Sequence, residues 1–420
     1  MRAHDARAAN PDRTPMLDFV KSEPNTLGVE VELQIVDRQT LELSPKAPQL
    51  LSRWSGPPTV QPEIFQSMLE VSTGICANAA AAEADLRATC SRLMPLAREQ
   101  GVRFIATGTH PTATYQERKL YPADRYHGLI ARNQWIARRL LIFGLHVHVG
   151  MPDPETCIAV QNDLLYDLGL LLAVSTSSPF WQGHATGLAS SRITVFEALP
   201  TGGMPALVHD WTEFCELVAT LQHANAITSL KDLWWDIRPS PRYGTLEIRV
   251  CDGLATIRET AMVVALVQAL ARRSAARVAV GVARPFPPAW RVRENKWRAS
   301  RHGMDADYIT GNDGSTMPIR PYLARTLDDL IENGFAAAGS SYIAELRRIA
   351  DGAPTSAERQ RALFESTGSL DEVTRALADE FEDDLLAGVA AERRKEPRPP
   401  DTPKAPEAVK APDAPDQPKR

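Results

Sequence analysis

The chain of 420 residues lacks the sequence signatures of several common protein classes. Its five cysteines are scattered and form no CxxC pair, so neither a disulfide framework nor a closed zinc site is expected, and the thiols are predicted to be reduced and packed. No Walker-A loop, GxGxxG sequence or GxSxG elbow occurs. The sequence therefore offers no glycine cradle for phosphates and no recognisable protein nucleophile.

Basic stripes and long apolar runs are also missing. The formal net charge is −5 and no stripe of Lys and Arg is interleaved with aromatic residues, which argues against nucleic acid as a partner. The N-terminal segment carries Asp5, Asp12 and Asp18 and no apolar run, so no signal peptide is visible. The most apolar internal stretch, Leu164 to Val174, is shorter than the roughly 20 residues that a spanning helix needs. We expect a cytoplasmic protein without a membrane partner.

The composition of the chain is that of a globular protein. Apolar residues make up 44% and charged residues 24%, and the length allows a sizeable core. Residues 1–15 form a loose polar leader in this interpretation. Residues 393–420 are rich in Pro, Ala, Lys and Asp and are predicted to be disordered, because such a segment cannot bury a core. Residues 16–392 are predicted to form a single domain.

Hydrophobic periodicity predicts strands and helices without a regular βαβ rhythm. Strands are expected at residues 26–37, 103–108, 144–149, 232–238 and 244–251, the last two as a hairpin. Helices are expected at residues 79–99, 124–136, 162–176 and 208–228, and after residue 257 apart from a break at 284–301. Residues 179–205, rich in Gly, Ser, Thr and Pro, are expected to be irregular and functional. The predicted class is α+β, an antiparallel sheet with helices packed on one side.

Four predicted strands place ionisable side chains at positions i and i+2, which point to the same face. The pairs are Glu30 and Glu32, His146 and His148, Asp236 and Arg238, and Glu247 and Arg249. Any one pair is typical of a solvated strand face. Four pairs in one chain favour a shared basin of carboxylates, imidazoles and arginines on the sheet face opposite the helices.

Such a basin suits divalent cations and phosphates. Carboxylate oxygens favour Mg²⁺ or Mn²⁺, and arginines supply the cations and forked donors that a triphosphate needs. Several carboxylates beside arginine therefore predict ATP bound with more than one ion. Glu63 and Glu70 extend the set: seven residues apart, they share a face if the segment is helical. If residues 68–73 form a strand instead, Glu70 shares its face with Met68 and Ser72.

Five segments resemble the carboxylate–amine ligase family, the second type of glutamate–cysteine ligase within the glutamine-synthetase-like superfamily. They are GVEVELQIVD (28–37), EIFQSMLEVSTG (63–74), GLHVHVG (144–150), SSPFWQG with TGLASSR (177–192), and RYGTLEIRVCDG (242–253). The resemblance covers residues 26 to about 390. It implies a single catalytic ligase domain with a saddle-shaped antiparallel sheet, helices on the convex face, and ATP, divalent ions and an acyl substrate on the concave face.

The resemblance also implies roles for individual residues. The expected metal ligands are Glu30, Glu32, Glu63, Glu70, His146 and Glu247. Arg249 is the expected phosphate-facing catalytic arginine, with Arg238 and His148 beside it at the nucleotide. Arg192 is expected to clamp phosphate or the substrate carboxylate. Val31 stands where relatives often carry a further acid, and this leaves the i, i+2 pair of acids intact.

The implied reaction uses ATP to join a small carboxylate substrate to an amine substrate through an acyl phosphate, with glutamate and cysteine as the first candidates. Two alternatives stay open at this point. One is a guanidino-kinase-like phosphotransferase, and the other is a member that binds nucleotide without turnover. The sequence also leaves a homodimer open.

Overall fold

The computed structural model describes residues 16–116 and 118–395, and side chains as far as residue 388. The predicted leader, residues 1–15, lies outside the described residues, as do residues 396–420 of the predicted tail. Helix α14 (Leu370–Lys395) continues past the predicted domain boundary at residue 392. Residues 393–395, predicted as tail, therefore belong to this helix.

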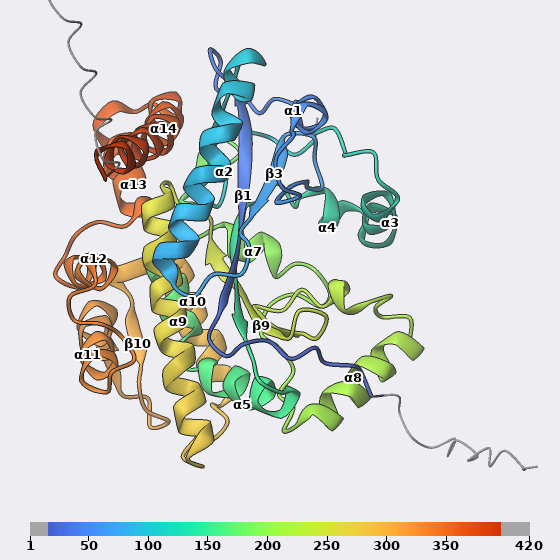
Figure 1. Cartoon of the computed structure of the whole chain (residues 1–420), viewed down its shortest axis with the longest axis vertical. Coiled ribbons are helices and arrows are strands. Elements are labelled where there is room, and N and C mark those ends of the chain that lie inside the picture. The colour runs from blue at the N-terminus through green and yellow to red at the C-terminus, as the bar shows by residue number, and fades with distance from the viewer. Residues whose placement is uncertain (1–15, 117, 396–420) are drawn as a thin grey trace, which may run out of the picture.

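A seven-stranded antiparallel sheet forms the centre of the molecule (Figure 1). Its main path runs β2 (Val60–Pro62), β3 (Met68–Ser72), β1 (Leu27–Asp37), β5 (Gly144–Gly150), β9 (Thr245–Asp252) and β8 (Ile237–Ser240), and β4 (Val102–Ile105) also pairs with β1. The strands predicted at 26–37, 144–149 and 244–251 match β1, β5 and β9 to within one residue. Their sharp alternation of apolar and polar residues explains this agreement.

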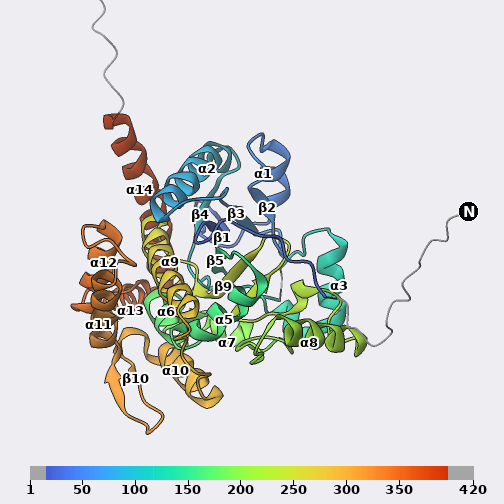
Figure 2. The ribbon, with the colours of Figure 1, turned by 60° about the horizontal axis from the view of Figure 1, so that its bottom comes forward.

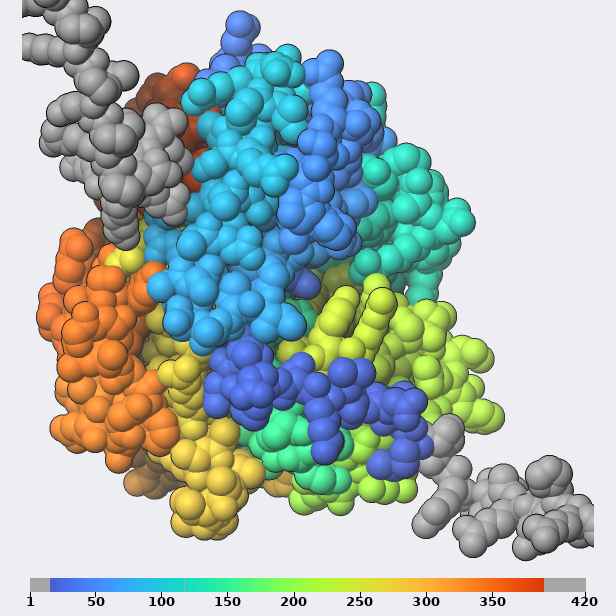
Figure 3. All heavy atoms as spheres, viewed as in Figure 1, coloured from blue at the N-terminus to red at the C-terminus, as the bar shows by residue number. Residues whose placement is uncertain are grey.

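One face of the sheet carries the apolar side chains and packs against helices. Val29, Val147 and Ile248, from the three central strands, are each at most 1% exposed. Helices α2 (Ala79–Glu99), α5 (Pro154–Leu164), α6 (Leu168–Ser175) and α9 (Ile257–Ala279) contact these strands or one another on this side (Figures 1 and 2). Helix α2 contacts β1 and lies at the front of the molecule in the space-filling view (Figure 3). The predicted α+β class is confirmed.

The remaining elements surround this core. They are α1 (Ala47–Arg53), α3 (Asp124–Asn133), α4 (Trp135–Arg138), the pair β6 (Phe180–Trp181) and β7 (His184–Ala185), α7 (Arg192–Phe196), α8 (Trp211–His223), α10 (Ala289–His302), the hairpin β10 (Asp307–Ile309) and β11 (Thr316–Pro318), α11 (Ile319–Glu332), α12 (Ser341–Ala350) and α13 (Ser356–Thr367). Short 3₁₀ turns lie at Leu230–Asp232 and Gly303–Asp305.

The helix predicted at residues 162–176 is wrong as a single element. Helices α5 and α6 replace it and meet at an angle of 67°. At the break, the carboxylate of Asp167 is buried and accepts hydrogen bonds from Arg273 and Arg284, at 2.8 Å each. Among the described residues, no single helix has the length and apolar character to cross a membrane, and α5 with α6 reach them only as this bent pair.

Further predictions differ from the structure. The helix predicted at residues 124–136 is divided into α3 and α4, and the hairpin β10–β11 interrupts the region after residue 257 that was predicted to be helical. Strand β8 begins at Ile237, because Leu230–Asp232 form a 3₁₀ turn and the backbone at Trp235 and the N–H of Asp236 pair with Gly203. The predicted break at 284–301 contains most of α10. The stretch at 179–205 holds β6, β7 and α7, and its residues 189–193 are buried. Backbone hydrogen bonds to Ser300, distant in sequence, order part of this stretch.

Candidate active site

The register of the sheet brings the predicted polar pairs together. Glu30 lies opposite His146 on β5, and Glu32 lies opposite Glu70 on β3. On the other side, Glu247 of β9 lies opposite both His148 and the β8 residue Arg238. We use the word basin for the polar cluster that results: Glu30, Glu32, Glu70, His146, His148, Arg238, Glu247 and Arg249.

Two groups of three side chains within the basin have the spacing of metal ligands. The ligand atoms of Glu30, His146 and Glu247 lie within 4.8 Å of one another, and so do those of Glu32, Glu70 and His146. His146 belongs to both groups, and its neutral imidazole offers one lone pair, so it can serve either group but only one ion at a time. Carboxylate oxygens with one imidazole are a donor set that Mg²⁺ or Mn²⁺ accepts. Five of the six predicted ligands are thus brought together.

Glu63, the sixth predicted ligand, lies in neither group of three. Residues 68–72 form strand β3, so the helical alternative for Glu63 and Glu70 is excluded. Glu63 comes from the connection before this strand, and the Ile64 N–H donates to its Oε2 at 3.0 Å. Its side chain lines a small cavity at the edge of the basin together with Glu32 and Arg249.

The acids on the β3 side of the basin are crowded and carry raised pKa values. Burial, with the charge of Glu63 as the next cause, raises the pKa of Glu32 to about 7. Burial and the charges of Glu30 and Glu63 raise the pKa of Glu70 well above its ordinary value. Burial also raises the pKa of Glu63. Repulsion between buried carboxylates is relieved by a proton or by a bound cation.

The acids on the β9 side are held as anions. Burial raises the pKa of Glu30, but hydrogen bonds with His146 (Nδ1 to Oε2, 3.3 Å) and His148 (Nε2 to Oε1, 3.5 Å) outweigh it and lower that pKa. Burial likewise opposes ionisation of Glu247, yet the charges of Arg238 and Arg249 hold its pKa well below the ordinary value. These two carboxylates are permanent negative charges at neutral pH.

The two histidines of β5 differ in charge. Burial and the nearby charge of Arg249 lower the pKa of His146 to about 4, so its imidazole is neutral at pH 7, as a metal ligand must be. Burial lowers the pKa of His148 as well, but the charge of Glu247 and the hydrogen bond with Glu30 outweigh burial and raise it. His148 Nδ1 also contacts Thr245 Oγ1 at 2.8 Å.

Both predicted arginines of the basin are fixed by Glu247. Arg238 donates from Nε to Glu247 Oε2 at 2.7 Å and from Nη1 to Leu233 O at 2.7 Å. Arg249 donates from Nη1 to Glu247 Oε1, and its guanidinium lies 5.8 Å from the ring centres of Phe196 and Trp234. Its buried Nε has no hydrogen-bond partner among the described residues, which leaves a donor available to a ligand.

Arg192 is buried beside the basin and does not sit at the tip of an open loop. It is 2% exposed, begins α7, and donates from Nη2 to Arg249 O at 3.2 Å. Its Nη2 lies against Gly144, where a Cβ would come within 2.2 Å of it. The Gly144 N–H donates to Glu32 Oε2 at 2.5 Å. Gly144 therefore brings Arg192 and Glu32 together.

Asp236, predicted to face the basin beside Arg238, lies elsewhere. Because β8 begins only at Ile237, Asp236 stands outside the alternation of the strand, and its buried carboxylate pairs with Lys296 of α10. Other residues at the site were not foreseen. Arg125, Tyr126 and Trp234 line the same small cavity as Glu63, but they belong to a surface helix and a loop whose sequence carries no metal or phosphate signal.

The sequence profile of glutamate–cysteine ligase family 2 (GCS2) matches residues 26–376. The chain belongs to this family. It is 50% identical over 372 residues to "Putative glutamate--cysteine ligase 2" of Bdellovibrio bacteriovorus, covering 88% of this chain and 98% of that protein. It is 42% identical over 391 residues to a protein of the same name from Thermobifida fusca, covering 91% and 97%.

Two solved structures share the fold of this GCS2 member. The glutamate–cysteine ligase of Francisella tularensis in complex with AMP has a TM-score of 0.60 at 12% identity, covering 90% of this chain and 95% of that one. A bifunctional glutathione synthetase of Pasteurella multocida has a TM-score of 0.59 at 13% identity, covering 86% and 52%. At these identities the likeness concerns the fold alone, and it confirms the predicted fold.

The five segments that resemble the family lie around the basin. Residues 28–37, 144–150 and 242–253 contain most or all of β1, β5 and β9, and residues 63–74 contain β3. Residues 177–192 lead into α7 and deliver Arg192. These segments therefore supply most of the residues of the basin, and Arg192 beside it.

Proposed function

We propose that this GCS2 member is an ATP-dependent carboxylate–amine ligase that joins L-glutamate to L-cysteine, with weak activity, and releases ADP and phosphate. The observation that carries this proposal is the basin itself. Carboxylates and an imidazole at metal-ligand spacing stand beside two arginines on one sheet face, in a chain of this family. No protein nucleophile is required, because the substrate carboxylate itself attacks the γ-phosphorus of ATP.

In the first step a carboxylate oxygen of glutamate forms a bond to the γ-phosphorus, and the bond to the β–γ bridging oxygen breaks, giving an acyl phosphate and ADP. In the second step the amine of cysteine attacks the acyl carbon, loses a proton, and expels phosphate. Catalysis of this kind rests on positioning and on neutralising charge at phosphoryl oxygens. The proposed arrangement assigns both tasks to the basin.

The donor set fits Mg²⁺ or Mn²⁺, since its ligands are carboxylate oxygens with one neutral imidazole. Glu30, His146 and Glu247 would hold one ion, and Glu32 and Glu70 a second, with Glu63 close to the latter. When bound, such ions neutralise negative charge on phosphate oxygens. Their presence would also relieve the repulsion that raises the pKa values of Glu32 and Glu70.

The arginines have separate tasks in this proposal. Arg249 is fixed by Glu247 and keeps its Nε available, so it can donate to the phosphoryl group as charge develops there. Arg238 and His148 flank the same carboxylate, and we assign them to the nucleotide. Arg192, next to Glu32, is suited to a substrate carboxylate or phosphate. We place the enzyme in the cytoplasm, which the five buried, free cysteines support.

Phosphate release from Mg-ATP, measured across pairs of carboxylates and amines with mass spectrometry of products, tests the proposal. We expect phosphate and a dipeptide-like amide only when ATP, a carboxylate and an amine are all present. Stoichiometric phosphorylation of one substrate without an amine and without free phosphate would indicate a phosphotransferase instead. Tight ATP binding with no phosphate release for any pair would indicate a non-catalytic nucleotide-binding protein.

A further inference from the structure

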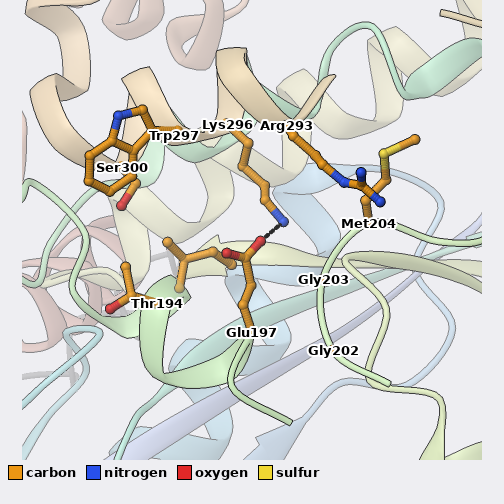
Figure 4. A pocket seen from close by; sticks show the side chains of 10 residues that line it. Thr194, Glu197, Gly202, Gly203, Met204, Arg293, Lys296, Trp297 and Ser300 are labelled. Atoms are coloured by element: carbon orange, nitrogen blue, oxygen red, sulfur yellow. Dashed lines mark ion pairs between the residues drawn. The ribbon is translucent and has the colours of Figure 1, made fainter. Parts of the chain in front are cut away.

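A buried lysine on α10, outside the basin, joins two segments that flank the basin. The side chain of Lys296 is 5% exposed, and its ammonium pairs with Glu197, which follows α7, and with Asp236, which precedes β8. Figure 4 shows Lys296 extending from α10 to the carboxylate of Glu197. Burial lowers the pKa of Lys296, but the charges of Asp236 and Glu197 outweigh burial and raise it, so the ammonium is charged at neutral pH. We call these three residues the Lys296 cluster.

Each carboxylate of the cluster lies close in sequence to an aromatic residue of the basin. Glu197 directly follows Phe196, and Asp236 lies two residues after Trp234. The rings of Phe196 and Trp234 pack edge to face with their centres 6.1 Å apart, and each centre lies 5.8 Å from the guanidinium of Arg249. The lysine itself lines a different cavity, between α7 and α10. The Lys296 cluster therefore ties together the two segments whose rings flank Arg249.

The backbone of Asp236 makes a second link to Arg249. Its carbonyl oxygen accepts a hydrogen bond from the Arg249 N–H at 2.7 Å, and its own N–H donates to Gly203 O at 2.8 Å. A displacement of Asp236 would therefore reach Arg249 both through the backbone and through the ring of Trp234.

Helix α10 also holds the segment that leads to Arg192. Four residues after the lysine, the Ser300 carbonyl accepts from the N–H groups of Ala189 at 2.7 Å and Ser190 at 3.0 Å, and Ser300 Oγ donates to Ser190 O at 2.8 Å. The guanidinium of Arg192 lies 5.5 Å from the ring centre of Phe196. One side of α10 thus contacts the segments on both ends of α7.

Stability alone explains the Lys296 cluster poorly. A buried ion pair is weak evidence for stability, because the cost of taking charges out of water offsets their attraction. Here one ammonium faces two carboxylates, and the buried Oδ1 of Asp236 has no hydrogen-bond partner among the described residues. Such an arrangement gains little free energy but fixes two segments in one geometry, as a supporting shell around a catalytic group requires.

We propose that Lys296 is a positioning residue for Arg249. Through Glu197 and Asp236 it holds the rings of Phe196 and Trp234 against the guanidinium, and it thereby fixes the direction in which the unpartnered Nε of the arginine donates. This inference rests on the role that the proposed function gives to Arg249.

Glu197→Ala tests the cluster with little risk to folding, because the side chain of Glu197 is 38% exposed. It removes the link to α7 and leaves the pair of Lys296 with Asp236. We expect kcat to fall about tenfold or more with little change in the KM for ATP, since a displacement of about 1 Å in a positioned group can cost up to about 10²-fold. Glu197→Gln, which can still accept a hydrogen bond from the ammonium, should lose less.

The matched control is Glu294→Ala on the same helix. Glu294 is 41% exposed and pairs with Arg298 of α10 at 2.8 Å, so both kinetic constants should stay at the wild-type values. An equal fall in kcat for the two alanine variants would overturn the proposal. A raised KM at constant kcat in Glu197→Ala would also overturn it, because the cluster would then act on ATP binding alone.

A double-mutant cycle with Arg249→Lys shows whether the cluster acts through Arg249. In that background the rings have no guanidinium to position, so Glu197→Ala should lower kcat by a smaller factor than in the wild type. The same factor in both backgrounds would overturn the proposal. Lys296→Met removes both links and should lower kcat further, but it leaves Asp236 buried without a counter-charge, so Glu197→Ala is the deciding variant.

Fluorine NMR of the full chain labelled with fluorotryptophan tests the cluster without catalysis. The chain has eight tryptophans, and Trp234→Phe assigns the resonance of Trp234. We expect Glu197→Ala to shift or broaden this resonance and Glu294→Ala to leave it unchanged. An unchanged Trp234 resonance in Glu197→Ala would overturn the proposal, whether or not phosphate is released. A shifted resonance in a protein that releases no phosphate for any substrate pair would instead support the link from α10 to the basin and contradict the proposed ligase activity.

Discussion

At the scale of single residues, Glu70 tests the metal assignment with the least disturbance to the fold. Its carboxylate is raised in pKa by burial and by the charges of Glu30 and Glu63, so removing its charge relieves repulsion in the metal-free protein. We expect Glu70→Gln to raise the melting temperature without metal and to reduce the further rise on adding Mg²⁺. Turnover of ATP should fall about 10²- to 10³-fold. Thermal denaturation with and without Mg²⁺, beside a phosphate-release assay, measures both effects.

The matched control for this prediction is Glu99→Gln. Glu99 pairs with Arg53 on the surface and its side chain is 58% exposed, so little change in stability or Mg²⁺ response is expected. An unchanged Mg²⁺ response in Glu70→Gln would remove Glu70 from the set of ligands. A melting temperature that falls without metal would contradict the repulsion inferred from the raised pKa.

Steady-state kinetics can show whether Arg249 acts in the transition state or only in binding ATP. Lysine keeps the charge but lacks the two-pronged guanidinium that contacts Glu247 and faces Phe196 and Trp234. If Arg249 acts on the transferring phosphoryl group, Arg249→Lys should lower kcat about 10²-fold or more and change the KM for ATP little. Steady-state kinetics with varied ATP distinguishes the two constants.

Arg242→Lys, on the same hairpin, is the control for Arg249. Arg242 is exposed and its guanidinium lies 5.7 Å from the ring centre of Tyr243, so both constants should stay at the wild-type values. A raised KM at constant kcat in Arg249→Lys would mean that Arg249 holds ATP equally in the ground and transition states. No change in either constant would place it outside the reaction.

His110 governs part of the acid stability and lies outside the basin. The Thr112 and Ala113 N–H groups donate to its Nδ1 at 3.2 and 3.1 Å, its Nε2 contacts Leu41 O at 2.9 Å, and burial lowers its pKa to about 4. Since the folded pKa is below the ordinary value of 6.5, this contribution to stability is present above pH 6.5 and is lost as the pH falls toward 4. The slope has a limit of about 1.4 kcal/mol per pH unit, with a total on the order of 3 kcal/mol.

The comparison that isolates this effect is the wild type against His110→Gln. Urea unfolding between pH 7 and pH 4 should show that the unfolding free energy of the wild type falls relative to that of the variant as the pH falls. The reason is that His110 binds a proton in the unfolded wild type at a higher pH than in the folded wild type, and glutamine binds none. His146, whose pKa is also about 4, acts in the same direction in both proteins and cancels. A difference that stays constant with pH would show that His110 titrates normally.

At the scale of elements, the sequence predicted what depends on neighbours along the chain and missed what depends on distant partners. Strands β1, β5 and β9 follow from their alternation, and α2 begins and ends where its periodicity does. The break between α5 and α6 could not be foreseen, because the partners of Asp167 are 106 and 117 residues away in sequence. Asp236 was misplaced for the same reason, since its partner Lys296 lies 60 residues further on.

Gly144, the first residue of β5, is predicted not to tolerate a larger residue. Gly144 leaves no room for a Cβ, which would come 2.2 Å from Arg192 Nη2 and 3.1 Å from His146 Nε2. We expect Gly144→Ala to displace the Arg192 side chain, to lower activity about tenfold or more, and to cost about 1–3 kcal/mol of stability through overpacking. Kinetics and urea denaturation of the purified variant measure both.

Gly128→Ala on α3 is the matched control. A Cβ at Gly128 meets nothing within 4 Å, and alanine in a helix is favoured over glycine by up to about 1 kcal/mol. This variant should be as stable as the wild type or slightly more stable, with unchanged activity. Equal behaviour of the two alanine variants would show that the contact between Gly144 and Arg192 does not constrain the site.

At the scale of the whole molecule, the site divides into a part set by strands and a part set by packing. The i, i+2 pairs of β1, β5 and β9 were visible in the sequence because the pleat alone fixes their common face. Glu63 and Trp234 reach the site from connecting segments, and Arg125 reaches it from the surface helix α3. The local sequence of these segments does not predict where they pack against the sheet. The burial of Arg192 at the start of α7 depends likewise on contacts with β9 that are distant in sequence.

The C-terminal part of the chain contains a docked helix followed by the predicted tail, and two truncations separate them. Helix α14 buries Val373, Leu377, Phe381 and Leu385, each at most 2% exposed. Its acids also pair with arginines from the sheet and α2: Asp384 with Arg87 at 2.8 Å and Asp379 with Arg103 at 2.6 Å. Removing residues 396–420, by contrast, removes a segment whose composition predicts that it buries no core.

We therefore expect a chain that stops after Lys395 to keep the melting temperature and the activity of the full-length protein within error. A chain that stops after Ser369 should fail to fold. It loses four buried apolar side chains, each worth about 1.5–3 kcal/mol, and this total approaches or exceeds the roughly 5–15 kcal/mol that stabilises a typical domain. Thermal denaturation followed by circular dichroism, and phosphate release, compare the stability and activity of the full-length chain with those of the two truncated chains. A drop of several degrees in the longer truncation would mean that residues beyond Lys395 contribute to stability, and a folded, active shorter truncation would contradict the structural role given to α14.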